Sequence, residues 1–349
     1  MPAPDAAVAY DLRQRALVSA TSNAVGRLWD RVGPRDDFGR AWDVEAALRT
    51  VTAGQVAAAG DAETYLVAVL PQVGLADAPA AGRLVPESFG GIASDGRDLG
   101  LLLEQPVIRA REAGGGAEGL RAGRAQLELI VRTQVADAAR EACQVAMAAR
   151  ARVGGYVRML TAPSCPRCVI LAGRFYRWNR GFRRHERCDC RHIPAAEDTA
   201  DEWLTDPRKA IASGQVRGFT RTQLKAIGDG ADPAQVVNAD RGTSTAVVGG
   251  RSVRVTTEGT TLRGYASYVR RAVDEQRGVQ TPTTAEQVGQ RGVVSNYVVR
   301  RTAPRLMPGE IYRVATSRDD AIRLLVANGY VMPAAVGQST IRGLASTVA

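Results

Sequence analysis

The 349-residue sequence has very little histidine or lysine. Its two histidines are His185 and His192, and its two lysines are Lys209 and Lys225. Because both imidazoles fall in one short segment, a Ser-His-Asp or Cys-His catalytic site elsewhere in the chain is excluded. Neither lysine is part of the motif GxxxxGK[ST] of a phosphate-binding loop, and the metalloprotease motif HExxH is absent. These absences exclude several common classes of enzyme.

Long apolar runs are also missing. No stretch approaches 18 apolar residues without a charge, and the first eleven residues lack the basic and apolar pattern of a secretory signal peptide. We therefore expect neither a membrane-spanning nor a secreted protein, and hence reduced thiols. An apolar content of 45% with 23% charged residues is typical of a folded chain, and the length allows two or three domains.

Positive charge is concentrated in two parts of the chain. Residues 1–150 contain 16 basic and 19 acidic residues, whereas residues 165–192 contain eight arginines against two acidic residues. Residues 243–349 carry a net charge of +7. Such an uneven distribution favours an anionic partner for the basic segments.

The spacing of apolar residues predicts a mainly helical chain. Helical periodicity runs through most of the first 85 residues, from Ala117 to about Arg152 and from Ser317 to Asn328. Residues 86–116 mix turn-forming residues with one apolar run, which favours an irregular connection. Cys143 falls close to the apolar stripe of the second helical region, so we expect it to be a small buried residue.

Strand patterns are short. Residues 156–160 alternate as a strand does, and residues 245–248 and 253–257 could pair as a hairpin across two glycines. The expected fold class is therefore α+β and mainly α-helical, with long helices, a small zinc-knuckle β-hairpin module and a mixed C-terminal region. The corresponding segments are a helical region at 1–116, a second region at 117–242 with the knuckle at 165–192, and a basic accessory region at 243–349.

Soft metal ligands gather in the segment 165–192, which contains four of the five cysteines and both histidines. A CxxC spacing lets one tight turn direct two thiolates at one metal, and the residues that follow return four further candidates. Zinc suits such a set because it takes four N or S ligands in a tetrahedron and has no redox chemistry of its own. The candidates are Cys165, Cys168, His185, Cys188, Cys190 and His192.

The identity of the four ligands stays open. Cys188, Cys190 and His192 alternate and would share one face of a strand, whereas His185 and Cys188 have the spacing of a second knuckle. A redox dithiol and ordinary reduced cysteines are the alternatives. A redox CxxC lies at a helix N-terminus in a thioredoxin-like βαβ setting, which the flanking patterns do not indicate.

Arginines and aromatic residues alternate between the two groups of ligands. The arginines could bind phosphates while the rings stack on bases. Alternatively, the rings form the core of a small module and the arginines are simply solvated. The arginines are Arg174, Arg177, Arg180, Arg183 and Arg184, and the aromatic residues are Phe175, Tyr176, Trp178 and Phe182.

The order CxxC, an apolar step to Gly173, and then HxxCxC resembles the signature of the bacteriophage Mu F-like minor head protein family. The resemblance covers roughly residues 117–195, including a long helix before the motif, and residues 231–238 resemble a segment of actinobacterial phage relatives. By position, the motif residues are Cys165, Cys168, His185, Cys188 and Cys190.

The resemblance implies a structural component of the virion, inside the capsid near the portal, that is present in the host cytoplasm during assembly. Its role would be in capsid assembly and in DNA packaging or ejection. The implied partners are the portal or major capsid protein and double-stranded DNA bound without sequence preference, with no membrane. The implied cofactor is a structural Zn²⁺, and no catalytic residue is expected.

Two alternatives belong to other functional classes. One is a zinc-dependent nucleic-acid-processing enzyme or regulator, with Glu186 as the base beside His185, although the deaminase order HxE followed by PCxxC is not present. The other is an effector toxin domain in the C-terminal third, because relatives in the resembled family are sometimes fused to effectors such as ADP-ribosyltransferases. No motif in residues 243–349 supports that reading.

Overall fold

The computed structural model describes residues 2–34, 37–180, 188, 190–248, 251–258 and 305–331. It confirms a mainly helical α+β chain with two small antiparallel sheets. Contacts group the chain into two compact units, one formed by residues 1–164 and 171–206 and the other by residues 165–170 and 207–349. The first unit contains the long helices that the periodicity predicts.

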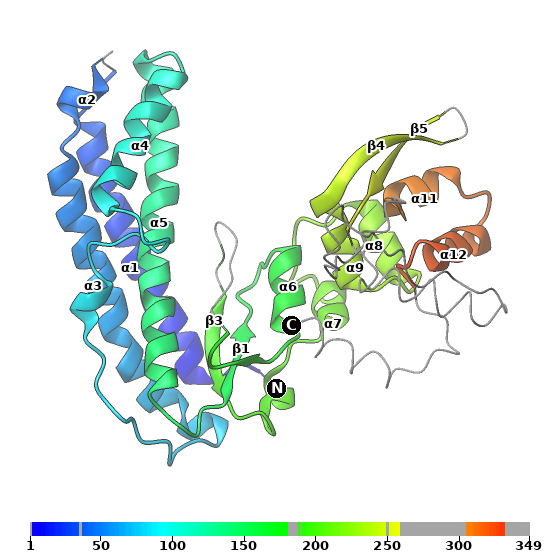
Figure 1. Ribbon diagram of the computed structural model, residues 1–349, viewed down its shortest axis with the longest axis horizontal. Coiled ribbons are helices and arrows are strands. Elements are labelled where there is room, and N and C mark those ends of the chain that lie inside the picture. The colour runs from blue at the N-terminus through cyan, green and yellow to red at the C-terminus, as the bar shows by residue number, and fades with distance from the viewer. Residues whose placement is uncertain are drawn as a thin grey trace, which may run out of the picture. The chain divides into compact units, whose positions relative to one another are not determined.

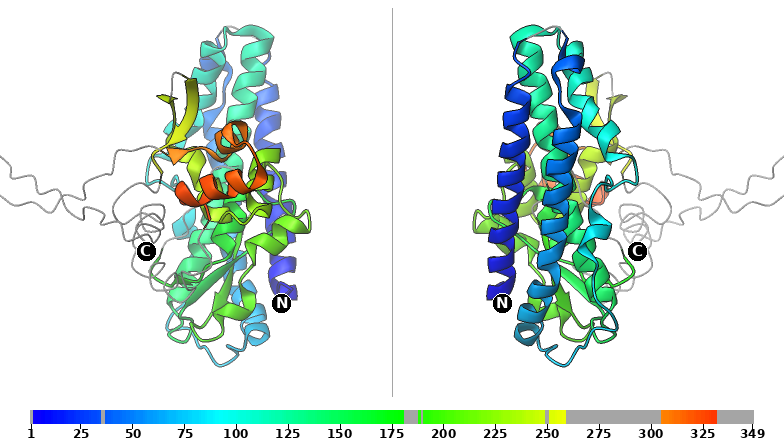
Figure 2. Two further views of the ribbon diagram at one scale, coloured as in Figure 1. Left: turned by 90° about the vertical axis from the view of Figure 1, so that its right-hand side faces the viewer. Right: turned by 90° about the vertical axis from the view of Figure 1, so that its left-hand side faces the viewer.

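Three long helices lie side by side in the first unit, as Figures 1 and 2 show. They are α1 (Asp5–Asp30), α3 (Val44–Val69) and α5 (Gly116–Ala148), and the short helix α2 (Phe38–Ala41) precedes α3. A Cβ at Gly123 of α5 would lie 2.2 Å from the ring of Trp29, so glycine is what allows α1 and α5 to approach closely there. No helix of the described residues is long and apolar enough to cross a membrane.

Helix α4 (Leu99–Glu112) corrects one prediction, since an irregular connection was expected throughout residues 86–116. The Asp98 side chain caps this helix by accepting a hydrogen bond from the Leu101 N–H at 2.9 Å. Leu99 and further residues at helical spacing along α4 are buried against α5. The apolar face thus continues past the short run that the sequence shows, and packing outweighs the proline within the helix.

A three-stranded antiparallel sheet follows the helices, in the order β2-β1-β3. The predicted strand is confirmed as β1 (Gly155–Met159), which lies between β2 (Tyr176–Arg177) and β3 (Arg191–Ala195). The two strands that flank the second half of the motif therefore pair with β1, not with each other as a simple hairpin would. A Cβ at Gly155 would lie 2.0 Å from the Tyr176 carbonyl oxygen, so the close pairing of β1 with β2 also needs glycine.

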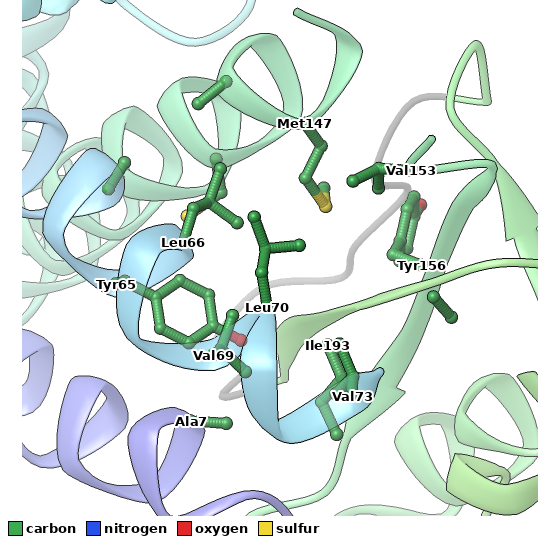
Figure 3. Close-up of a cluster of buried hydrophobic side chains, with 14 of the residues drawn as sticks. Ala7, Tyr65, Leu66, Val69, Leu70, Val73, Met147, Val153, Tyr156 and Ile193 are labelled. Atoms are coloured by element: carbon green, nitrogen blue, oxygen red, sulfur yellow. The ribbon is translucent and has the colours of Figure 1, made fainter. Parts of the chain in front are cut away.

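The sheet packs on the helices through one apolar cluster, shown in Figure 3. Helix α3 supplies Tyr65, Leu66 and Val69, and the other labelled side chains come from α1, α5, β1, β3 and the segments that join these elements. The position of β3, and of the cysteines just before it, is therefore set by the long helices. The labelled side chains are Ala7, Tyr65, Leu66, Val69, Leu70, Val73, Met147, Val153, Tyr156 and Ile193.

The second unit combines short helices with a sheet of order β4-β5-β6. The predicted hairpin is confirmed, and the predicted C-terminal helix begins at its cap Ser317 and ends before Gly329, whose φ is 71°. Residues 259–304 of the predicted accessory region lie outside the described residues. The elements are α7 (Pro207–Ala212), α8 (Arg221–Gly228), α9 (Pro233–Ala239), β4 (Thr243–Val248), β5 (Arg251–Thr256), β6 (Arg305–Leu306), α11 (Pro308–Val314) and α12 (Arg318–Ala327).

Candidate metal centre

Three cysteines from the two halves of the motif come together. The Sγ atoms of Cys168, Cys188 and Cys190 all lie within 4.8 Å of one another, and all three residues are buried. Thiolates bound tetrahedrally to zinc at about 2.3 Å stand about 3.8 Å apart, so a small side-chain movement brings this set to zinc geometry. The three cysteines could therefore hold a metal ion such as zinc.

Cys165 lies immediately before helix α6 (Pro166–Ala172), and Cys168 is in its first turn. The Cys168 N–H donates a hydrogen bond to the Cys165 Sγ at 3.3 Å. The CxxC thus does lie at a helix start, which the sequence did not indicate. The surrounding topology differs from a thioredoxin-like βαβ unit, because β1 and β2, which flank α6 in the chain, pair antiparallel.

His192 lies on β3 and is 2% exposed. Its ring meets the ring of Tyr156 edge-on, with 4.4 Å between centroids, and it is not one of the three clustered ligands. Burial, and then the positive charges of three nearby arginines, lower the pKa of His192 well below its usual range. The imidazole is therefore neutral at physiological pH.

Some predicted site residues cannot be placed. His185 and Glu186 lie outside the described residues, as do Arg183 and Arg184. Their predicted roles stay predictions.

Arg140 of α5 holds the segment that carries two of the cysteines. Its Nε donates to the Cys190 carbonyl oxygen at 3.3 Å, and its Nη2 donates to the Cys188 carbonyl oxygen. The third contact is an ion pair with Asp137, with 2.9 Å between Nη1 and Oδ1, and both side chains are only 5% exposed. The buried carboxylate therefore orients the guanidinium toward the two carbonyls.

The next two residues of the chain are bound by the other long helices. Arg191 donates from Nε to Oδ1 of Asp11 on α1 at 3.0 Å, in a second buried ion pair. The Tyr65 hydroxyl on α3 donates to the His192 carbonyl oxygen at 2.5 Å. Cys188 and residues 190–192 are thus tied to α1, α3 and α5, and the cysteine geometry depends on how these helices pack.

These contacts also shape the electrostatics of the site. The Arg140 guanidinium lies against the carbonyl oxygens of Cys188 and Cys190, and the guanidinium groups of Arg140 and Arg191 are both balanced by buried carboxylates. A cysteine binds metal as the thiolate, so metal binding at this site releases the thiol protons.

In the arginine-rich segment, some aromatic residues fit the prediction of a small core and one fits the prediction of stacking on bases. Phe175 and Tyr176 are partly buried against the apolar cluster of the first unit, as expected of core residues. Trp178 is 53% exposed, as expected of a residue available for stacking. The side chains of Arg174, Arg177 and Arg180 are exposed as well.

No protein-family model, curated protein or solved structure matches the chain. The resemblance to the Mu F-like minor head proteins accordingly rests on the motif residues of the sequence.

Proposed function

We propose that the chain is a structural minor head protein of a phage, acting near the portal in capsid assembly and in DNA packaging or ejection. The observation that carries the proposal is the convergence of Cys168, Cys188 and Cys190, because these residues come from both halves of the motif that resembles this family. A buried site made of cysteines suits a scaffold, since catalytic zinc sites keep a position open to water or substrate.

The proposed metal is a structural Zn²⁺. Cys168, Cys188 and Cys190 would supply three thiolates, and the fourth ligand would be Cys165 or His185. A closed site of this kind contributes folding free energy on the order of 10 kcal/mol. The ion would add this stability to that of the apolar cluster on which the sheet packs.

The proposed partners are DNA, bound without sequence preference, and the portal or capsid protein. Support comes from the exposed Arg174, Arg177 and Arg180 and from the net charge of +7 on residues 243–349. Binding through phosphates releases counterions, so the affinity for DNA should fall steeply with salt. A salt-insensitive or sequence-selective isotherm would contradict this part of the proposal.

The direct test is mass spectrometry of phage heads purified on a density gradient from an induced culture of the organism that carries the gene. We expect the chain in the heads at a few copies per particle, together with portal protein. Heads without the chain would contradict the proposal. Turnover of DNA or RNA by the zinc-loaded protein, lost in Glu186→Gln, would favour the enzymatic alternative.

A further inference from the structure

A tight turn at residues 177–180 presents a tryptophan to solvent. The turn is closed by the Arg180 N–H, which donates to the Arg177 carbonyl oxygen at 2.9 Å. Trp178 and Asn179 form its tip, and all four side chains are exposed. Trp178 leaves 53% of its surface accessible, which is unusual for the largest apolar side chain.

The main chain of this turn is firmly attached to the rest of the first unit. The Trp178 N–H donates to the Gly154 carbonyl oxygen at 3.0 Å, and the Gln144 side chain donates to the Trp178 carbonyl oxygen. The Tyr156 hydroxyl donates to the Arg180 carbonyl oxygen at 3.2 Å. The ring is therefore exposed because the fold holds it there, and not because the segment lacks structure.

The other three tryptophans behave differently. Trp29 is fully buried, Trp42 is 6% exposed, and each donates its indole N–H to a main-chain carbonyl oxygen. Trp203 is partly buried against the apolar cluster of the first unit. Trp178 is thus the tryptophan whose ring packs least against the protein.

Arginines lie close to Trp178 in the chain. Arg177 and Arg180 stand on either side of Trp178, and Arg174 lies just before β2. Arg177 pairs with Glu197 at 3.1 Å, so part of its charge is neutralised. Within the described part of the chain, neither Arg174 nor Arg180 has an acidic group within ion-pair distance. These two exposed arginines are therefore available to an anion.

We propose that this turn binds unpaired nucleotides of single-stranded DNA, with Trp178 stacked on a base and Arg174 and Arg180 on the adjacent phosphates. Proteins that bind single strands combine these two elements, a basic track and an exposed aromatic ring. The bases of a duplex are already stacked, so a ring on a protruding turn gains little there. An acidic protein surface would engage the arginines but give the ring no role. The inference rests on the proposed contact with DNA and narrows it to unpaired strands.

The test uses full-length protein and a fluorescently labelled 20-nucleotide oligo(dT), read by anisotropy. Trp178→Ala should weaken binding by about 5- to 150-fold, since one base-aromatic stack contributes about 1–3 kcal/mol. Trp178→Phe should retain most of the affinity, and a 20-base-pair duplex should bind Trp178→Ala and wild type equally. The double variant Arg174→Gln with Arg180→Gln should bind both oligo(dT) and the duplex more weakly. For oligo(dT), the slope of the logarithm of the affinity against the logarithm of the salt concentration should become shallower by about 1.4. Arg121→Gln with Arg132→Gln removes two charges from exposed positions of α5, so it is the matched charge control and should change little.

Three results would overturn the inference. One is unchanged oligo(dT) affinity in Trp178→Ala, and another is an equal loss for duplex and single strand in that variant. The third is a weaker affinity for heparin in Trp178→Ala than in wild type, because heparin has charge but no bases on which the ring could stack. Circular dichroism and bound metal are measured on each variant, so a folded, metal-loaded Trp178→Ala that binds oligo(dT) normally refutes this inference and leaves the proposed head function standing.

Discussion

Arg140 donates its Nε hydrogen to the main-chain carbonyl oxygen of Cys190 at 3.3 Å, and so joins helix α5 to the segment that carries two of the clustered cysteines. The same guanidinium is held by Asp137 from one helical turn earlier. A metal ion bound by the cysteines would therefore stabilise the packing of the helices, and the helices in turn hold the cysteines in place.

Replacing Arg140 tests this connection. Arg140→Met keeps the bulk of the side chain but breaks the buried ion pair with Asp137 and the hydrogen bonds to the carbonyl oxygens of Cys188 and Cys190, so we expect the free energy of unfolding to fall by about 3–5 kcal/mol. Urea denaturation of the metal-loaded protein measures this. Arg132→Met, at an exposed position of the same helix, should change stability by less than about 0.5 kcal/mol. Equal denaturation midpoints for Arg140→Met and wild type would contradict the structural role of the pair.

The stacked rings of Tyr65 and Tyr10, with centroids 4.2 Å apart, offer a matched pair of substitutions. The Tyr65 hydroxyl serves the buried carbonyl of His192, whereas the Tyr10 hydroxyl meets the Cys143 sulfur at 3.2 Å, a weak partner. Tyr65→Phe should cost about 1–3 kcal/mol of unfolding free energy because a buried carbonyl loses its donor, and Tyr10→Phe should cost less. Equal costs in chemical denaturation would refute the difference.

Stability at alkaline pH should depend on Cys143. Burial is the main cause that raises the pKa of this thiol from 9.0 to about 12. Between these values the folded chain holds a proton that the unfolded chain has lost, so the free energy of unfolding falls as pH rises. The slope from this group approaches about 1.4 kcal/mol per pH unit.

The measurement compares denaturation at about pH 8 and about pH 10.5 in wild type and in Cys143→Ala. The substitution removes the Sγ atom and its packing at both pH values. The change in unfolding free energy between the two pH values therefore reports the ionisation of the thiol. Wild type should lose more stability over this interval than the variant. Identical losses would show that the buried thiol does not resist ionisation.

The helices of the fold were the most predictable part. Continuous apolar periodicity marked α5, and the cap at Ser317 with Gly329 beyond it marked α12, because both signals are local. Helix α4 was missed because a glycine and a proline within it obscure its apolar periodicity. The pairing of β1 between β2 and β3 was missed for a different reason, since strand partners are set by tertiary packing and leave no local signal.

The sequence pointed to a group of candidate metal ligands, but not to the contacts from the long helices that hold them in place. The motif pointed to one metal and left the ligands open among Cys165, Cys168, His185, Cys188, Cys190 and His192. Within the described part of the chain, three of these, Cys168, Cys188 and Cys190, cluster. Asp11 and Arg191 stand 180 residues apart, and no pattern in the sequence links them. Partners that far apart in the chain are brought together only by the folded helices, so sequence reasoning could not find them.

Metal content of the purified full-length protein, measured by elemental analysis, tests the central claim most directly. We expect one tightly bound zinc per chain in wild type and in Cys143→Ala, whose cysteine lies outside the cluster. Cys168→Ala and Cys188→Ala should lose the zinc and unfold at lower denaturant concentration, and Cys165→Ala shows whether that thiol is the fourth ligand. Wild-type protein without metal, or Cys188→Ala that retains zinc and stability, would contradict the account.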